Sequence, residues 1–346
     1  MTKRDMSLSP EERLLLTASP HLKSPDSTPK IMWNVVGSLA PIILVAIYYF
    51  GPSAILVMAA AIIGAVGVEW LFGPRKSLWD GSAAITGILL GLCLPAGFPL
   101  WMAFIGGAFG IAFGKLVFGG LGQNPFNPAL VGRAFLQAAF PTAITTWPAS
   151  EMAWGAIRGP NFAAPLFGGV PGADVVTAAT PLGLWKFEGQ ITDLFGLVVG
   201  NTGGSLGETA GILILICGGY LAARRYLNWR IPLGIFATVF VFSEILYLVN
   251  GEAYPPPFFM LFSGGLMLGA VYMATDMVTS PVTNLGSWIF AVGIGLMVVL
   301  IRVWGGLPEG VMYAILFMNA FVPFINRATQ PRVFGHSKKK VKEAQA

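Results

Sequence analysis

The chain has 346 residues, of which 55% are hydrophobic and only 11% are charged, and its mean hydropathy is +0.71. This composition excludes an ordinary soluble domain and indicates an integral membrane protein. The net charge of +5 is concentrated in the two polar tails, a pattern that predicts membrane topology rather than nucleic-acid binding.

The first 30 residues are polar and lack the apolar core of a signal peptide, so residues 1–30 are predicted to be a cytoplasmic extension. Ten apolar segments follow, each near or below the ~20 residues that a membrane-spanning helix needs. They lie at about 35–50, 54–72, 79–95, 100–118, 128–146, 206–222, 231–249, 258–276, 286–304 and 309–326.

A less hydrophobic stretch from Trp147 to about Ser205 divides these segments into two blocks of five. Because five is an odd number, the second block enters the membrane from the opposite side, as in an inverted-topology repeat. The fold class expected is therefore an all-α membrane protein with ten transmembrane helices in two inverted five-helix repeats. The predicted units are the extension at 1–30, the first repeat at 31–146, a loop at 147–205, the second repeat at 206–326 and a basic tail at 327–346.

Basic residues give an independent test of this topology. With the N-terminus inside, the loops predicted to be cytoplasmic contain Arg75-Lys76, Arg224-Arg225 and Arg230, and Lys115 and Arg133 lie at the edges of another. The loops predicted outside contain few lysines or arginines. The positive-inside rule then predicts that both termini are cytoplasmic and that the loop at 147–205 lies outside the cytoplasm.

Two Asn-Pro pairs, at Asn124 and Asn127, stand directly before an apolar segment. An asparagine before proline favours a break in helical structure. One alternative is a helix cap and turn at the membrane surface. The other is a broken helix in which these asparagines and the freed backbone groups bind a buried polar ligand.

Three acidic residues lie in or near apolar segments, where an unpaired charge is costly, and are candidates for an ion path: Glu69, Glu244 and Asp276. Glu69 could instead pair with Arg75. Asp276 lies in a hydroxyl-rich break and could cap a helix end or coordinate a cation.

Thr180 lies in the sequence Thr177-Ala178-Ala179-Thr180-Pro181-Leu182. The alanines leave its hydroxyl uncrowded, and Pro181 favours a turn directly after it. By composition alone, a turn or a helix cap is the more common role for such a threonine. Attachment of a modifying group is the alternative.

Four motifs occur in a fixed order, at Gly119–Leu136, Thr177–Leu182, Gly203–Gly211 and Ala274–Pro281. Together they resemble the family that contains the D subunit of the Rnf ion-translocating ferredoxin:NAD⁺ oxidoreductase complex. The B subunit of the Na⁺-translocating NADH:quinone oxidoreductase is a more distant member. The resemblance covers about residues 30–330, and the short amino-terminal extension is more similar to the Rnf subunit.

The resemblance implies FMN joined by a phosphoester to Thr180 by a flavin transferase, with Thr177 as the alternative acceptor. It also implies a non-covalent riboflavin among the membrane helices, beside Asn124 and Asn127. The chain would then relay electrons between these flavins in a multi-pass subunit of the bacterial inner membrane. Its partners would be the other Rnf subunits, including an extracytoplasmic subunit that carries FMN, and the relay would be coupled to Na⁺ or H⁺ translocation.

Cys93 and Cys217 are the only cysteines, so the chain itself lacks the cysteine clusters of an iron–sulfur protein. It also lacks a Rossmann fingerprint for binding nicotinamide. No catalytic residue and no metal ligand set is predicted. Three alternatives stay open: a B-type subunit of the quinone reductase, a passive inverted-repeat transporter without flavin, and a structural anchor for other subunits.

Overall fold

The computed structural model describes residues 26–75, 77–148, 157, 159–163, 179–200, 202–208 and 211–331. Every helical or strand element recorded in these residues is a helix. In the first half these are α1 (Thr28–Phe50), α2 (Pro52–Phe72), η2 (Ser77–Asp80), α3 (Ser82–Leu92), α4 (Leu100–Ile111) with the π-helical turn η3 (Ala112–Leu116), α5 (Pro128–Ala139) and α6 (Pro141–Thr145).

The middle of the chain contributes η4 (Gly159–Phe162), α7 (Pro181–Gly183) with the π-helical turn η5 (Leu184–Glu188), and α8 (Leu194–Val199). The second half contains α9 (Gly211–Ala223), α10 (Arg230–Val249), α11 (Pro257–Phe262), α12 (Leu266–Leu268) with the π-helical turn η7 (Gly269–Met273), α13 (Asn284–Trp304) and α14 (Val311–Ala328).

Five of these helices, α1, α2, α10, α13 and α14, are long and apolar enough to cross a membrane. Shorter apolar helices lie at Ser82–Leu92, Leu100–Leu116 and Gly211–Ala223. This all-helical arrangement is that of a multi-pass membrane protein, as the composition predicts.

Two of the predicted apolar segments are broken into shorter helices. The segment at 128–146 divides at Phe140, which has φ −134° and ψ 59° and precedes Pro141, a position that disfavours helical geometry. The segment at 258–276 divides at Ser263 and Gly264, and Gly264 has φ +66°. A left-handed backbone at Gly264 ends α11 and lets α12 begin in a new direction.

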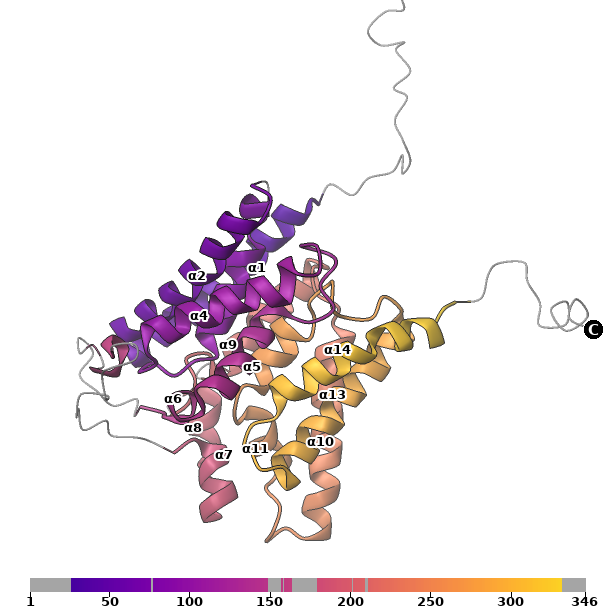
Figure 1. The fold of residues 1–346 in the computed structure, drawn as a ribbon. Coiled ribbons are helices and arrows are strands. Elements are labelled where there is room, and N and C mark those ends of the chain that lie inside the picture. Colours follow the sequence, from indigo (N-terminus) through magenta and orange to yellow (C-terminus); the bar gives the residue numbers. More distant parts are fainter. Residues whose placement is uncertain are drawn as a thin grey trace, which may run out of the picture.

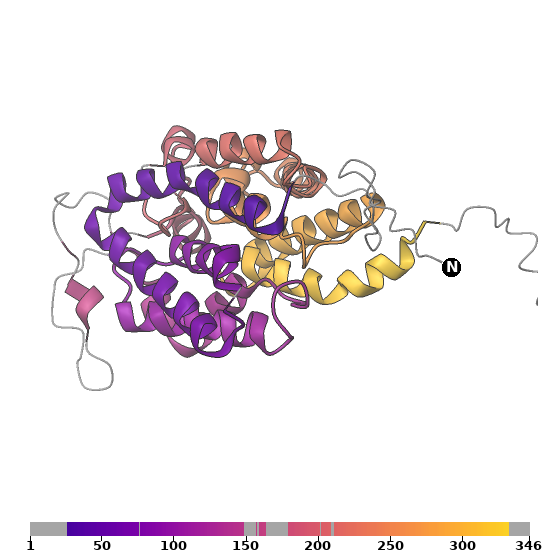
Figure 2. The ribbon, with the colours of Figure 1, turned by 90° about the horizontal axis from the view of Figure 1, so that it is seen from above.

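The two halves of the chain form two groups of packed helices (Figure 1). In the first half α2 packs most extensively against α4, and in the second half α10 packs against α13. Gly64 makes the first of these contacts close, since a Cβ there would lie 2.0 Å from the carbonyl oxygen of Phe104. Figure 2, viewed from above, shows α1 beside α9, a contact that joins the two groups.

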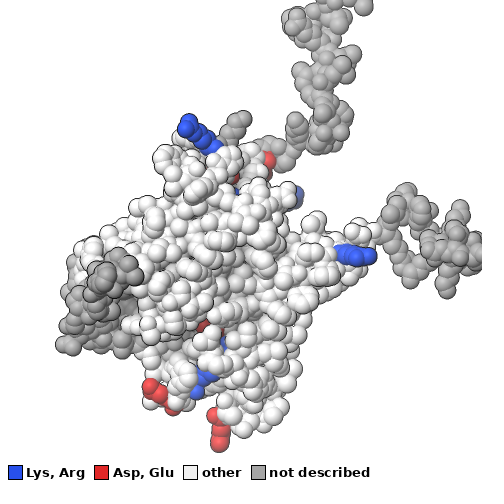
Figure 3. Space-filling view, in the orientation of Figure 1, with Lys and Arg blue, Asp and Glu red and all other residues white. Residues whose placement is uncertain are grey.

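Charged side chains are few on the face of the molecule that Figure 3 shows. In Figure 3 most of them lie near the two ends, with acidic and basic groups at each end and a further basic group beside the outgoing C-terminal segment. Most of the surface between the two ends is uncharged in this view, as expected for helices that face lipid.

Candidate functional site: two cavities on one helix

Thr180 begins a short helix. It is the N-cap of α7, and its Oγ1 accepts a hydrogen bond from the backbone N–H of Gly183 at 3.1 Å, while Pro181 occupies the first turn. The cap predicted as the common role of this threonine is therefore confirmed. The cap uses the hydroxyl oxygen only as an acceptor, and the side chain is half-buried rather than sealed in the core.

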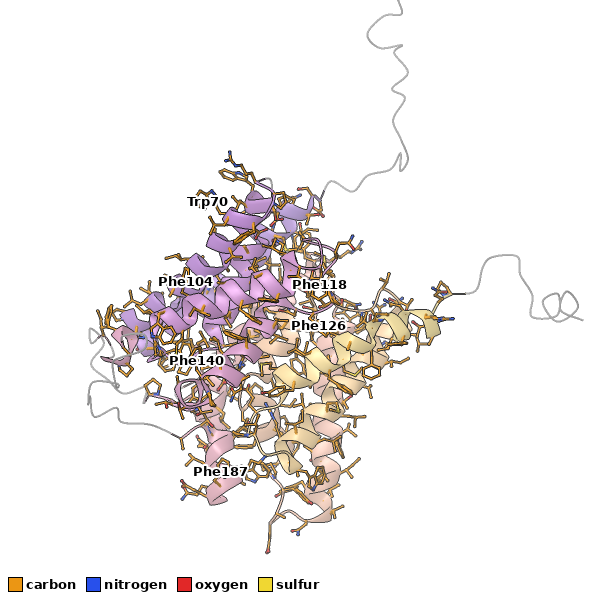
Figure 4. All side chains as sticks on the ribbon, in the orientation of Figure 1. Trp70, Phe104, Phe118, Phe126, Phe140 and Phe187 are labelled. Atoms are coloured by element: carbon orange, nitrogen blue, oxygen red, sulfur yellow. The ribbon has the colours of Figure 1, made fainter. Side chains whose placement is uncertain are left out.

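Thr180 also lines a cavity of about 600 Å³, which we call the Thr180 cavity. Its walls come from the segment at 179–188, from α5, from residues 145–147, from Glu208 and from the loop and helix start at 306–313. Three aromatic side chains line it: Trp147, Phe187 and Tyr313. Figure 4 shows Phe187 at the lower end of the molecule. A volume of this size lies within the ~300–1,000 Å³ typical of cofactor pockets.

An ion pair forms part of the wall of the Thr180 cavity. Arg133 on α5 places its Nη2 2.5 Å from Oε2 of Glu309, and Oε1 of Glu309 accepts the backbone N–H of Gly265 at 2.6 Å. The Nε of Arg133 is buried and has no hydrogen-bond partner within the described residues. The sequence identified Arg133 only as a basic residue at a loop edge and gave no sign of Glu309.

A second arginine stabilises the broken helix behind this wall. Arg302 is fully buried, and its guanidinium donates to the carbonyl oxygens of Met260 at 2.5 Å and Ser263 at 2.9 Å. These carbonyls lie at the end of α11, where a positive charge offsets the negative end of the helix dipole. The break at Gly264 is thus held by Arg302 on one side and by Glu309 on the other.

Asn124, Asn127 and Asp276, distant in sequence, line one narrow groove, which we call the Asn127 groove. Asn127 is the N-cap of α5, where its Oδ1 accepts from Ala129 N at 3.0 Å. Its Nδ2 donates to the carbonyl oxygen of Met273 at 3.1 Å. The cap that the Asn-Pro pair predicts is confirmed, because Asn127 caps α5. The binding of a buried polar ligand by Asn124 and Asn127 stays a prediction.

Two features of the Asn127 groove bear on what it could hold. Oδ1 of Asn124 is buried without a partner among the described residues and lines the groove, so it is free to accept a hydrogen bond. The free space is about 90 Å³, enough for a few water molecules. The polar groups suit a flavin, but the walls must separate for an isoalloxazine ring to enter.

Asp276 makes hydrogen bonds within its own turn. Its Oδ1 accepts from Val278 N at 3.2 Å, and its Oδ2 accepts from the hydroxyl of Thr279 at 3.3 Å. These bonds close a turn between η7 and α13, and the N-cap of α13 is Thr283, so Asp276 does not begin a helix. A role of Asp276 in an ion path stays a prediction.

Glu69 is fully buried and pairs with Lys115, at 2.5 Å, instead of Arg75. The hydroxyl of Ser82 also accepts from Lys115, at 2.6 Å. Lys115 and Ser82 line the Asn127 groove, whereas Glu69 lies behind them. The expected pairing with Arg75 is wrong because η3 brings Lys115 into the core beside α2.

The remaining predicted residues lie elsewhere. Glu244 is half-buried on α10 and lines neither cavity. Thr177 lies outside the described residues. In the glycine-rich motif that begins at Gly203, the backbone N–H of Gly207 bonds to the carbonyl oxygen of Leu92 at 2.7 Å. That amide is therefore not available to an anion.

One helix, α5, forms part of both cavities. Asn127 at its start lines the groove, and Arg133 six residues later lines the Thr180 cavity. At 1.5 Å per residue these positions are about 9 Å apart along the helix axis. The two cavities are therefore close neighbours along one helix.

Known proteins resemble this chain over most of its length. Residues 15–335 match the model of the NQR2, RnfD, RnfE family. The D subunit of the proton-translocating ferredoxin:NAD(+) oxidoreductase complex of Clostridium ljungdahlii is 40% identical, with 92% of this chain and 96% of the relative covered. The D subunit of the Na(+)-translocating ferredoxin:NAD(+) oxidoreductase complex of Acetobacterium woodii is 39% identical, with 97% and 99% covered.

The D subunit of the ion-translocating oxidoreductase complex of Stutzerimonas stutzeri is 41% identical, with 90% of this chain and 93% of the relative covered. Because the family model spans most of the chain and these relatives align over almost their whole length, the chain belongs to the NQR2, RnfD, RnfE family.

Proposed function

We propose that this chain is a flavin-bearing membrane subunit of an ion-translocating ferredoxin:NAD⁺ oxidoreductase complex. It relays electrons between FMN attached to Thr180 and riboflavin bound in the Asn127 groove, and this relay is coupled to movement of Na⁺ or H⁺. The observation that carries the proposal is that Thr180, the threonine of the motif, opens onto the Thr180 cavity.

The lining of the Thr180 cavity suits FMN. Trp147, Phe187 and Tyr313 offer faces on which a flat isoalloxazine can stack, and Arg133 supplies a cation for its polar edge. When bound, FMN supplies one- and two-electron transfer, and the surrounding residues orient it and tune its potential. A phosphoester at Oγ1 of Thr180 fixes the cofactor without modifying its ring.

The short separation along α5 supports the relay. Asn127 and Arg133 belong to one rigid helix, so the distance between the two flavins would be set by the fold rather than by a mobile domain. In the Asn127 groove, Oδ1 of Asn124 would accept from the ring N–H of a flavin once the walls separate.

The proposal includes a topology of ten transmembrane helices in two inverted repeats, with both termini cytoplasmic. The matching packing of α2 with α4 and of α10 with α13 supports the repeat. The basic loops at Arg75 and Arg224 support the orientation. This orientation places Thr180 on the outer side, where an extracytoplasmic flavin subunit can exchange electrons with it.

For the ion path we propose Asp276, Glu244 and Glu69, of which Asp276 is the candidate that lines a cavity. A carboxylate at such a position binds Na⁺ or a proton according to its surroundings. The proposal does not choose between the two ions, since a proton-translocating relative and a Na⁺-translocating relative are similarly related to this chain.

The test measures the fluorescence of flavin that stays covalently bound to the chain after denaturation. The chain is produced with its flavin transferase, denatured, separated by electrophoresis and viewed under ultraviolet light, together with Thr180→Ala. We expect a fluorescent band in the parent and none in the variant. A parent band without fluorescence would contradict the proposal and favour a passive transporter, and a fluorescent Thr180→Ala band would move the attachment to Thr177.

The activity of the assembled complex distinguishes a structural anchor from a flavin relay. A structural anchor predicts that Thr180→Ala assembles and leaves ferredoxin:NAD⁺ electron transfer intact. The flavin relay predicts that the same variant assembles and loses it.

A further inference from the structure

Lys186 lies on η5, six residues after Thr180, and its ammonium group is surrounded by backbone carbonyl oxygens. Its Nζ donates to the oxygens of Gly305 at 2.5 Å, Arg302 at 2.9 Å and Leu307 at 3.0 Å. A fourth carbonyl oxygen, that of Ile301, lies farther away, at 3.5 Å. An ammonium group has three donors, and the three shorter hydrogen bonds use all of them. All three carbonyls belong to the end of α13 or to the loop that follows it.

This interaction joins two walls of the Thr180 cavity. One wall is the segment at 179–188, which contains Thr180, and the other is the loop at 306–309 that ends with Glu309. Through Glu309, the same loop is bonded to Arg133 on α5 and to the break at Gly265. Lys186 therefore connects the candidate attachment segment to the framework that holds the rest of the cavity.

A second contact fixes the other end of the attachment segment. Leu182 is buried and packs against Gly264, where a Cβ would lie 2.7 Å from Cδ1 of the leucine. Leu182 and Lys186 lie on the single short helical segment that Thr180 caps. Two anchors on eight residues restrict rotation of that segment, and so restrict the position of anything attached to Oγ1.

A lysine at this position costs free energy, because its ammonium group is partly removed from water. A side chain that only filled space would not have this cost. Partial burial lowers the pKa of Lys186, because the ammonium group loses water. Among the described residues no carboxylate forms an ion pair with it. An apolar side chain would avoid this cost, but it could not hold the carbonyls at the end of α13 at a fixed distance.

We propose that Lys186 is the positioning residue for the flavin carried by Thr180: by binding the carbonyl oxygens of Arg302, Gly305 and Leu307, it holds the attachment segment against the cavity in the orientation that electron transfer requires. This inference rests on the proposed attachment of FMN to Thr180. It assigns no contact between Lys186 and the flavin.

The experiment compares the parent with Lys186→Met, Lys186→Arg and, as a matched control, Lys30→Met in the assembled complex. Lys30 is an exposed lysine that pairs with Asp26 at the other end of the molecule. For each variant the covalent fluorescence on a denaturing gel reports attachment. The fluorescence anisotropy of the bound flavin, its reduction potential and its single-turnover reduction rate report position.

We expect Lys186→Met to keep its covalent fluorescence while anisotropy falls and the reduction rate drops by about tenfold or more, since misplacement by 1 Å can cost about 100-fold. Lys186→Arg keeps a charged multiple donor and should recover most of the anisotropy and rate. Lys30→Met should match the parent.

Unchanged anisotropy, potential and rate in a flavinylated Lys186→Met complex would overturn the inference and leave the proposed function intact. A parent chain without covalent fluorescence would overturn both. If Lys186→Met does not assemble, Lys186→Gln, which keeps a donor without charge, is held to the same expectations.

Discussion

The guanidinium of Arg133 and the carboxylate of Glu309 are 2.5 Å apart, although 176 residues separate them in the sequence. The pair joins α5, in the first half of the chain, to the loop that leads into α14, in the second. Both side chains are at least four-fifths buried, with exposures of 9% and 17%. The contact between the halves is therefore also a wall of the Thr180 cavity.

Replacement of Arg133 by glutamine should destabilise the chain by about 3 kcal/mol or more, because it leaves the carboxylate of Glu309 buried without its cation. Thermal unfolding of the detergent-solubilised protein measures this loss. The double variant Arg133→Gln with Glu309→Gln should cost less than the sum of the single changes. Additive costs in this cycle would show that the two residues do not stabilise each other.

The variant Thr180→Asn distinguishes the two roles of Thr180, because it should keep the helix cap and remove the hydroxyl to which FMN would be attached. Asparagine is a good N-cap, so the hydrogen bond to Gly183 N should persist and the stability should change by less than about 0.5 kcal/mol. Thr180→Ala should lose about 1 kcal/mol along with the cap. Neither variant has a hydroxyl, so both should lack covalent flavin on a denaturing gel. Fluorescence retained by Thr180→Asn would contradict attachment at this residue.

Gly264→Ala should destabilise the protein by about 1–3 kcal/mol, because alanine is strained at φ +66° and its methyl group would meet Leu182. Gly37→Ala is the control. Gly37 lies within α1 and no atom lies within 4 Å of a Cβ placed there, so alanine should be neutral or stabilising by up to about 1 kcal/mol. Equal melting temperatures for the two variants would refute this account of the break.

Asn127→Asp tests the link between α5 and η7. Aspartate keeps the acceptor that caps α5 but loses the donor to the carbonyl oxygen of Met273. We expect the helical content to be unchanged and the amount of flavin released on denaturation to fall. Asn127→Ala should lose the cap as well. Full riboflavin content in both variants would argue against a flavin in the Asn127 groove.

Sodium dependence tests the proposed ion path. Asp276→Asn should reduce Na⁺-stimulated activity most, since Asp276 lines the Asn127 groove. Glu244→Gln should have the smallest effect of the three, because Glu244 lines neither cavity. Glu69→Gln removes the charge that balances Lys115 and should lower stability as well as activity. Three variants that respond to Na⁺ like the parent would refute the ion path.

Much of the local structure follows from the sequence. The helix starts at Thr180 and Asn127 are the clearest cases, because an N-cap followed by proline is a signal contained in two adjacent residues. The multi-pass membrane class follows from composition for a similar reason, since hydrophobic content over ~20 residues is a local quantity. That Asn124, Asn127 and Asp276 line one groove does not follow from any local pattern, because Asp276 is distant from the two asparagines in the sequence.

The sequence by itself determined the membrane class, the caps and the threonine motif, because each depends on neighbouring residues. Only the tertiary structure decided which charges pair and which polar groups share a cavity. Glu69 bonds to Lys115 instead of Arg75, and Lys186 bonds to carbonyls more than one hundred residues away. Such contacts depend on how helices pack, and glycine contacts, helix breaks and π-helical turns set that packing in ways that hydrophobic pattern alone does not encode.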